Sequence, residues 1–91
     1  MSILLLFLAC AKESPADLLS ESKELITEQK YSEALEKLRL IVGKYPDVIE
    51  AAESQYMIGD AYIAFNKNFE VAIKEYSKVV KDYPDSRFAI N

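Results

Sequence analysis

The chain has 91 residues, of which 51% are hydrophobic and 29% are charged, and its 11 basic and 15 acidic residues give a formal net charge of −4. This length allows one small domain, and the mixed, slightly acidic charge lacks the positive field that nucleic-acid binding requires. The chain has no His and a single Cys, Cys10, which excludes His/Cys metal sites, Ser-His-Asp or Cys-His catalysis and an internal disulfide.

The first predicted element is an apolar run of seven residues, Ile3 to Ala9, far shorter than the roughly 20 residues that span a bilayer. Its length is typical of the hydrophobic region of a short signal peptide, with the small residue Ala9 at the cleavage position. Residues 1–9 are therefore predicted to be a signal-like segment and residues 10–14 a polar tether. The alternative is an apolar N-terminal helix that packs on the domain, with Cys10 as a buried thiol.

The stretch Phe7-Leu8-Ala9-Cys10 resembles the lipobox of bacterial lipoproteins. The resemblance implies that Cys10 becomes the first mature residue and carries lipid. Two features depart from the pattern: Phe7 stands where Leu is usual, and no Lys or Arg precedes the apolar run. Ala11, where Asp would signal retention, implies delivery to the outer membrane.

Few Gly and Pro, with abundant Leu, Ala, Glu and Lys, favour an all-α fold. Ser14 and Pro15 supply an N-cap and a proline at the first helical position, so the first helix is predicted over Pro15 to Gln29. In the second helix, apolar residues recur at helical spacing from Ala34 to Tyr45. That helix ends at Tyr45-Pro46, because the residue before a proline is disfavoured in a helix.

Asp47, with Glu50 three residues later, predicts a capping box, so the third helix is expected to begin near Val48 and to end near Phe65. Asn66-Lys67-Asn68 predicts a turn, followed by a fourth helix over Phe69 to Asp82. Residues 86–91 predict the opening turn of a fifth helix.

An internal repeat of 38 residues decides the architecture. Tyr31-Ser32-Glu33-Ala34-Leu35 recurs as Phe69-Glu70-Val71-Ala72-Ile73, and Lys44-Tyr45-Pro46-Asp47 recurs as Asp82-Tyr83-Pro84-Asp85, with offsets of 69 − 31 and 83 − 45. Repeats of this length predict helical hairpins that bury their apolar faces by stacking on each other.

Ile58-Gly59-Asp60-Ala61-Tyr62, followed by Ala72, Tyr76 and Pro84, resembles the tetratricopeptide repeat. The resemblance implies an α-solenoid fragment of two antiparallel hairpins, residues 15–45 and 46–85, and the start of a third repeat at residues 86–91. Gly59 and Ala72 lack bulk, so the paired helices can approach while Tyr62 and Tyr76 fill the surrounding space. In the first repeat, Ser22 occupies the Gly position and Leu25 the Tyr position.

The long period and the ending Tyr83-Pro84-Asp85-Ser86 resemble repeats of two bacterial envelope families: the BamD-like lipoproteins of outer-membrane assembly and the periplasmic coordinators associated with Tol-Pal. The lipobox, tether and first hairpin fit the lipoproteins better. The sequence thus predicts a non-catalytic, lipid-anchored scaffold for protein partners, facing the periplasm. A soluble adaptor that binds peptides or partner helices in the periplasm or cytoplasm is the alternative. No cofactor, metal or catalytic residue is predicted, and Asp17, Glu21 and Glu24 are interpreted as exposed helix charges.

The partner-binding groove of such a solenoid is implied to lie along the first helix of each hairpin. The implied residues are Leu19, Lys23, Ile26 and Thr27 in the first hairpin and Glu53, Tyr56, Asp60 and Ile63 in the second. The alternatives are that Tyr56 and Ile63 pack in the core and that the charged residues are solvated. Two hairpins leave an apolar face beside Tyr76 and Val80 uncovered. We therefore expect either a truncated reading frame or a chain that is completed by a partner or by a second copy.

Overall fold

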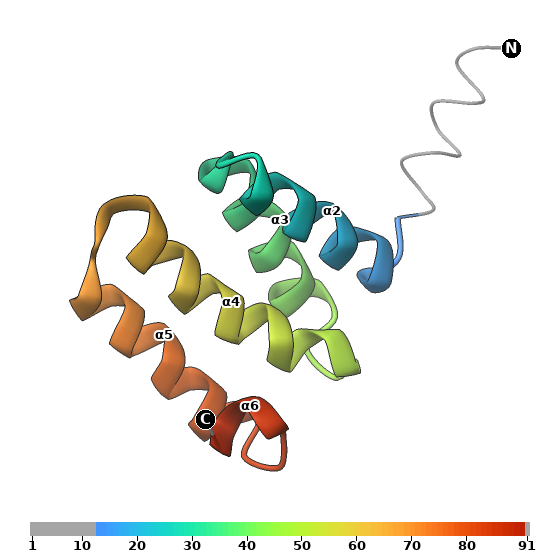
Figure 1. Ribbon diagram of the computed structural model, residues 1–91. Helices are drawn as coiled ribbons and strands as arrows, with labels where there is room; N and C mark the ends of the chain where they lie inside the picture. The colour runs from blue at the N-terminus through green and yellow to red at the C-terminus, as the bar shows by residue number, and fades with distance from the viewer. Residues whose placement is uncertain (1–12, 91) are drawn as a thin grey trace, which may run out of the picture.

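The structure, a computed structural model, describes residues 13–90, and within this range all regular secondary structure is helical, as predicted. Two antiparallel hairpins pack side by side (Figure 1). The helices are α2 (Pro15–Thr27), α3 (Tyr31–Lys44), α4 (Ile49–Asn66), α5 (Phe69–Asp82) and the short α6 (Arg87–Ile90). The first hairpin consists of α2 and α3 and the second of α4 and α5.

The predicted signal-like segment (1–9) and the predicted lipidation site, Cys10, lie outside the described residues, as does most of the predicted tether (10–14). Among the helices that the structure does describe, none is long and apolar enough to cross a membrane.

The central element is α4, which contacts α2, α3, α5 and α6. A helix with neighbours on several sides must carry small or apolar side chains around most of its circumference. In α4, two alanines of the first turn and a glycine near the middle are accordingly buried. The main core cluster joins the first hairpin to α4. Its buried members are Leu18, Leu19, Leu38, Ile41, Ala51 and Ile58.

The 38-residue repeat of the sequence is also a repeat of backbone geometry. Tyr45 and Tyr83 end their helices with φ/ψ angles of −127°/55° and −133°/55°, and each N–H donates to the carbonyl four residues earlier at 2.8 Å. After the turn, Ala51 and Ala89 each donate to the carbonyl three residues earlier at 3.0 Å. The chain therefore enters α6 in the way that it enters α4, and the predicted start of a fifth helix is confirmed.

The predicted start of the first helix is confirmed as well. The Ser14 hydroxyl accepts a hydrogen bond from the Asp17 N–H at 3.1 Å, and the Ser14 N–H donates to the Asp17 carboxylate at 3.5 Å, so the two residues form a capping box. Pro15 occupies the first turn, where a missing N–H costs nothing. The helix ends at Thr27, two residues before the predicted Gln29, which has a left-handed φ of 64°.

The predicted capping box at the third helix is wrong. The N-cap of α4 is Val48, without a side-chain cap, and Asp47 lies one residue earlier in the turn. The reason is that the Tyr45 carbonyl accepts the Val48 N–H at 3.3 Å, which places Asp47 inside a closed turn rather than at the helix entrance. The helix start is therefore held by backbone hydrogen bonds and packing.

The hydrogen bond that closes the hairpin spans one more residue in the second hairpin than in the first, although fewer residues separate α4 from α5 than separate α2 from α3. In the first hairpin, the Lys30 N–H donates to the Leu25 carbonyl at 2.8 Å; in the second, the Asn68 N–H donates to the Tyr62 carbonyl at 3.1 Å. Leu25 and Tyr62 are 37 residues apart, whereas Lys30 and Asn68 are 38 apart. The same hydrogen bond thus closes both turns and spans the extra residue in the second.

Gly59 lets α4 and α5 approach closely, as the sequence predicted. A Cβ atom at this position would lie 2.5 Å from Cδ1 and 3.0 Å from Cζ of Tyr76, inside the ring's van der Waals envelope. The other glycine, Gly43, has nothing within 4 Å of such an atom. The absence of a side chain is therefore required for packing at Gly59 and not at Gly43.

Candidate functional site: the inner surface

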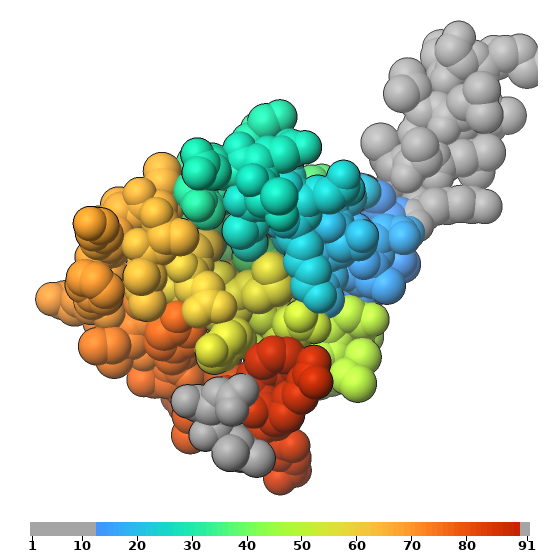
Figure 2. Space-filling view, in the orientation of Figure 1, coloured from blue at the N-terminus to red at the C-terminus, as the bar shows by residue number. Residues whose placement is uncertain are grey.

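The predicted groove residues come from α2 and α4, which contact each other, and the surface of α4 lies between those of α2 and α6 (Figure 2). Seven of the eight predicted residues are exposed or half-buried, and we refer to the six of them that do not pack against the core cluster as the inner surface. They are Lys23, Thr27, Glu53, Tyr56, Asp60 and Ile63.

An ion pair between Lys23 of α2 and Glu53 of α4 joins the two hairpins across the inner surface. The distance from Lys23 Nζ to Glu53 Oε2 is 2.9 Å, and the lysine side chain is about half exposed. Exposed pairs of this kind contribute about 0 to 1 kcal/mol, so exchanging one partner for another charge costs little. The pair therefore places two opposite, partly accessible charges on the inner surface.

Aromatic rings gather around Tyr56. Its ring centroid lies 5.3 Å from that of Tyr76 on α5 and 5.4 Å from that of Phe88 on α6. The Tyr76 hydroxyl donates a hydrogen bond to the Asp60 carboxylate, and burial together with this bond raises the pKa of Tyr76 above its ordinary value. Tyr56 is thus held between two rings while part of its surface remains accessible.

The other two predicted groove residues do not line a groove. Leu19 is buried and belongs to the core cluster with Ala51 and Ile58 of α4, and Ile26 packs against the same cluster. The equivalent of Leu19 in the second hairpin is Tyr56, which is 37 residues later and remains accessible. The difference arises because the first hairpin is covered by the whole of α4.

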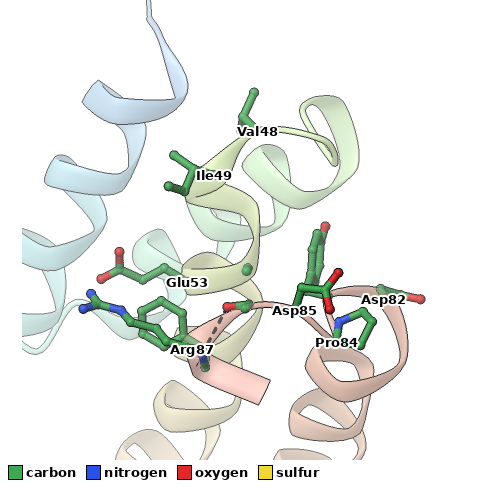
Figure 3. A pocket seen from close by; sticks show the side chains of 11 residues that line it. Val48, Ile49, Glu53, Asp82, Pro84, Asp85 and Arg87 are labelled. Carbon is green, nitrogen blue, oxygen red and sulfur yellow. Dashed lines mark hydrogen bonds between the residues drawn. The ribbon is translucent and has the colours of Figure 1, made fainter. Parts of the chain in front are cut away.

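A pocket that the sequence did not predict borders the inner surface. It has a volume of about 630 Å³ and lies between the first turns of α4 and the turn from α5 to α6 (Figure 3). Its apolar lining includes Ile49, which is 87% exposed, and its rim carries Glu53, Asp82 and Asp85. The lining residues are Val48, Ile49, Ala52, Glu53, Asp82, Tyr83, Pro84, Asp85, Ser86, Arg87 and Phe88.

The recurrence of Tyr-Pro-Asp was the available signal for this pocket, because it falls between the predicted end of the fourth helix at Asp82 and the predicted start of the next helix at residue 86. The turn's distance from the start of α4 depends on how the two hairpins pack, and no local pattern encodes that. A highly exposed isoleucine beside a hollow is the arrangement expected at a contact surface, since such groups gain by being covered.

A buried carboxylate, Glu75, is the other feature that sequence reasoning missed. It is 6% exposed, and its partners come from both hairpins: Gln55 Nε2 donates to Glu75 Oε1 at 2.9 Å, and Arg39 donates to Oε2 at 3.3 Å. Arg39 also donates to the Tyr62 hydroxyl at 3.1 Å. Burial alone would raise the pKa of Glu75, but the hydrogen bond from Gln55 and the charge of Arg39 outweigh it and hold the pKa below its usual value.

Gln55 of α4 and Arg39 of α3 hold the two carboxylate oxygens of Glu75, and no buried side-chain polar atom lacks a partner among the described residues. This carboxylate therefore has a structural environment, one that locks α3, α4 and α5 together. Elsewhere in residues 13–90, no three acidic, His or Cys side chains come together as a metal site would require. The exposed carboxylate of Glu21 pairs with Lys37 at 3.0 Å, which lowers the pKa of Glu21.

A comparison with protein families matches residues 53–86 to the tetratricopeptide repeat. No curated protein and no solved structure matches the chain. The matched stretch contains most of α4, all of α5 and the turn to α6, and it includes the close contact of Gly59 with Tyr76. Residues 53–86 of this chain are therefore similar to a tetratricopeptide repeat, and the match ends with the turn that leads into α6.

Proposed function

We propose that this chain is a non-catalytic module that binds a peptide segment of another protein on its inner surface and in the pocket that borders it. The observation that carries the proposal is the 630 Å³ pocket beside Glu53, with an apolar side chain, Ile49, almost fully exposed at its edge. Stacked helical hairpins present extended surfaces of this kind to partners. The charged groups of the lining are three carboxylates and one guanidinium, that of Arg87, and this net negative charge favours peptides in which an apolar anchor stands next to Lys or Arg.

The test selects ligands from a random peptide library and measures their affinity for two matched variants. Ile49→Ser removes the exposed apolar group at the pocket, and Leu40→Ser removes an exposed apolar group on α3 that lies outside the pocket. The expected result is a loss of about tenfold or more for Ile49→Ser and no change for Leu40→Ser. Equal affinities for the two variants, or a library that yields no ligand, would refute the proposed binding site.

The location that we propose for this module is the outer membrane of a bacterial envelope, facing the periplasm, with lipid on Cys10 as the anchor and outer-membrane protein assembly as the process. The support is the sequence Phe7-Leu8-Ala9-Cys10 and the polar residues that follow it. Incorporation of labelled palmitate that is lost in Cys10→Ala is the expected result. A soluble protein that retains Met1 would reject the anchor.

The second candidate is a soluble adaptor in the periplasm or cytoplasm. Its support is the inner surface itself, since Tyr56 and its neighbouring rings need no membrane to bind a peptide. Partner capture that is insensitive to Cys10→Ala and sensitive to Tyr56→Ala favours the adaptor over the anchored scaffold. Capture lost in both variants favours the anchored form.

A further inference from the structure

The pocket at Ile49 has two charged sides. Glu53 and Arg87 lie on one side of the pocket, and Asp82 and Asp85 lie on the other (Figure 3). The first two residues belong to α4 and α6, and the other two belong to the end of α5 and to the turn that follows it. We call these the helix side and the turn side of the pocket. The ion pairs of the chain give the two sides different net charges.

The helix side has a net positive charge. The carboxylate of Glu53 is paired with Lys23 at 2.9 Å, so its charge is compensated within the chain. The guanidinium of Arg87 lies 4.9 Å from the centroid of the Phe88 ring and forms no ion pair with any of residues 13–90. Since the charges of Lys23 and Glu53 cancel, the charge that remains on this side is that of Arg87.

The turn side has a net negative charge. Within the described part of the chain, neither Asp82 nor Asp85 forms an ion pair. Tyr83, which lies between them in the sequence and also lines the pocket, responds to this charge. Burial raises the pKa of the Tyr83 hydroxyl, and the negative charges of Asp82 and Asp47 raise it further. The turn from α3 to α4 therefore adds to the negative charge at this end of the pocket.

The rest of the pocket lining, apart from Ser86, is apolar or aromatic. It consists of Val48, Ile49, Ala52, Tyr83, Pro84 and Phe88. Covering such a surface with an apolar side chain is favourable, because apolar area is removed from water. An apolar anchor that occupies the pocket therefore has positive charge on its helix side and negative charge on its turn side.

The helix α6 borders the pocket without filling it. Only its first two residues, Arg87 and Phe88, belong to the lining. The Phe88 ring packs on Tyr56, which lies two turns after Ile49 along α4. The direction of α6 therefore leads away from Ile49, and the two charged sides remain accessible to a ligand.

We propose that this pocket selects peptides that carry opposite charges on the two sides of an apolar anchor: a basic residue at Asp82 and Asp85, and an acidic residue at Arg87. The inference rests on the proposed function, because it specifies the ligand of the same pocket. The net negative charge of the lining alone would favour basic residues on both sides of the anchor. Separated charges instead disfavour a second basic residue, which would meet Arg87.

The probes are three labelled peptides with capped ends. The parent peptide is Glu-Gly-Leu-Gly-Lys, in which alternate side chains lie on the same side of an extended backbone. One variant has Gln in place of Glu, and the other has Gln in place of Lys. Each peptide is made in both sequence orders, and the tighter order is compared, because the charges of the pocket do not define the direction of the peptide backbone.

Fluorescence anisotropy with the full chain gives two ratios of dissociation constants. The cation effect is the affinity gained from Lys over Gln, and the anion effect is the affinity gained from Glu over Gln. Each is expected to be about threefold or more in the wild type and to weaken as salt rises. Asp82→Asn with Asp85→Asn should abolish the cation effect and retain the anion effect. Arg87→Gln should do the reverse.

Control variants make the same changes of net charge at exposed positions outside the pocket. Glu36→Gln with Glu70→Gln matches the double aspartate variant, and Lys74→Gln matches Arg87→Gln. Both effects should remain as in the wild type, because the Debye length at physiological salt is only about 8 Å. Circular dichroism verifies that each variant is folded.

Three results would overturn the inference: no binding of the parent peptide, a wild type in which either effect is absent, or pocket variants that reduce both effects alike. The last result would mean that the ligand senses only the overall charge. The proposed function is judged separately, by comparing Ile49→Ser with Leu40→Ser. Binding that is lost in Ile49→Ser but insensitive to the charges of the peptide refutes the charge selection and leaves the peptide site in place.

Discussion

Replacing Gly59 by Ala is the most direct test of how the second hairpin is packed. The new methyl group would lie 2.5 Å from Cδ1 of the Tyr76 ring and 3.0 Å from its Cζ. The ring has little freedom to withdraw, because its hydroxyl is bonded to Asp60 and its face packs on Tyr56. Either α4 and α5 must separate or both of these contacts must change.

Gly43→Ala is the matched control, since Gly43 is also helical and has open space around it. Alanine favours a helix over glycine by up to about 1 kcal/mol at either position. At Gly59, overpacking adds a cost of about 1 to 3 kcal/mol. The two variants should therefore differ by about 1 to 3 kcal/mol, with Gly43→Ala the more stable.

Urea unfolding followed by circular dichroism measures this difference. With an m-value of about 1 kcal/mol/M, typical of a small protein, the two midpoints should be separated by roughly 1 to 3 M. Equal midpoints, or a higher midpoint for Gly59→Ala, would show that the ring moves aside without cost and that the close approach is not required.

A double-mutant cycle locates the clash. In the first hairpin, Ser22 stands at the position of Gly59 and Leu38 at the position of Tyr76. A residue larger than glycine is therefore paired there with a side chain smaller than tyrosine. Gly59→Ala should therefore be less destabilising in the Tyr76→Leu background, with a coupling energy of about 0.5 to 3 kcal/mol. If the effects of the two substitutions on the free energy of unfolding are additive, the cost of Gly59→Ala does not arise from a clash with Tyr76.

Three further outcomes are expected. Ser14→Ala, which removes the capping box of α2, should cost about 1 kcal/mol in urea unfolding; an unchanged midpoint would mean that the helix start is frayed. The pKa of Glu75 is lower in the folded chain than in the unfolded chain. The ionised carboxylate therefore contributes fully to the free energy of unfolding above the unfolded pKa of about 4.5, and this contribution is lost as pH falls through the folded pKa. Glu75→Gln should therefore lose less stability than the wild type between about pH 7 and pH 3, and parallel losses would contradict this. Lys23→Ala and Glu53→Ala should each change stability by less than about 1 kcal/mol in thermal melts, since the pair is exposed; a larger loss would mean that it holds the hairpins together.

Features that depend on nearby residues were predicted well from the sequence. Pro15 and Ser14 mark the start of α2 because their effects act within one turn, and Gly59 is recognisable because its repeat context pairs it with Tyr76. The prediction that Asp47 caps the third helix was wrong because aspartate is common both at helix N-caps and in turns. The hydrogen bond from the Val48 N–H to the Tyr45 carbonyl places Asp47 in the turn.

Features that depend on packing between hairpins could not be predicted in this way. Glu75 resembles any charged helix residue in the sequence, and its burial requires Arg39, 36 residues earlier, and Gln55, 20 residues earlier. Leu19 and Tyr56 occupy equivalent positions, but only Leu19 is covered by a complete helix. The groove prediction treated the two hairpins as identical, whereas their neighbours differ.

The pattern of contacts in this fold bears on how fast it forms. Among the described helices, each packs on the next one or the next but one along the chain, and no contact joins helices further apart. Chains dominated by such local contacts fold in microseconds to milliseconds, because little loop entropy is lost before contacts form. Hydrogen exchange should therefore be slowest at the centre of α4 and fastest in α6, with opening that spreads inward from the ends of the stack.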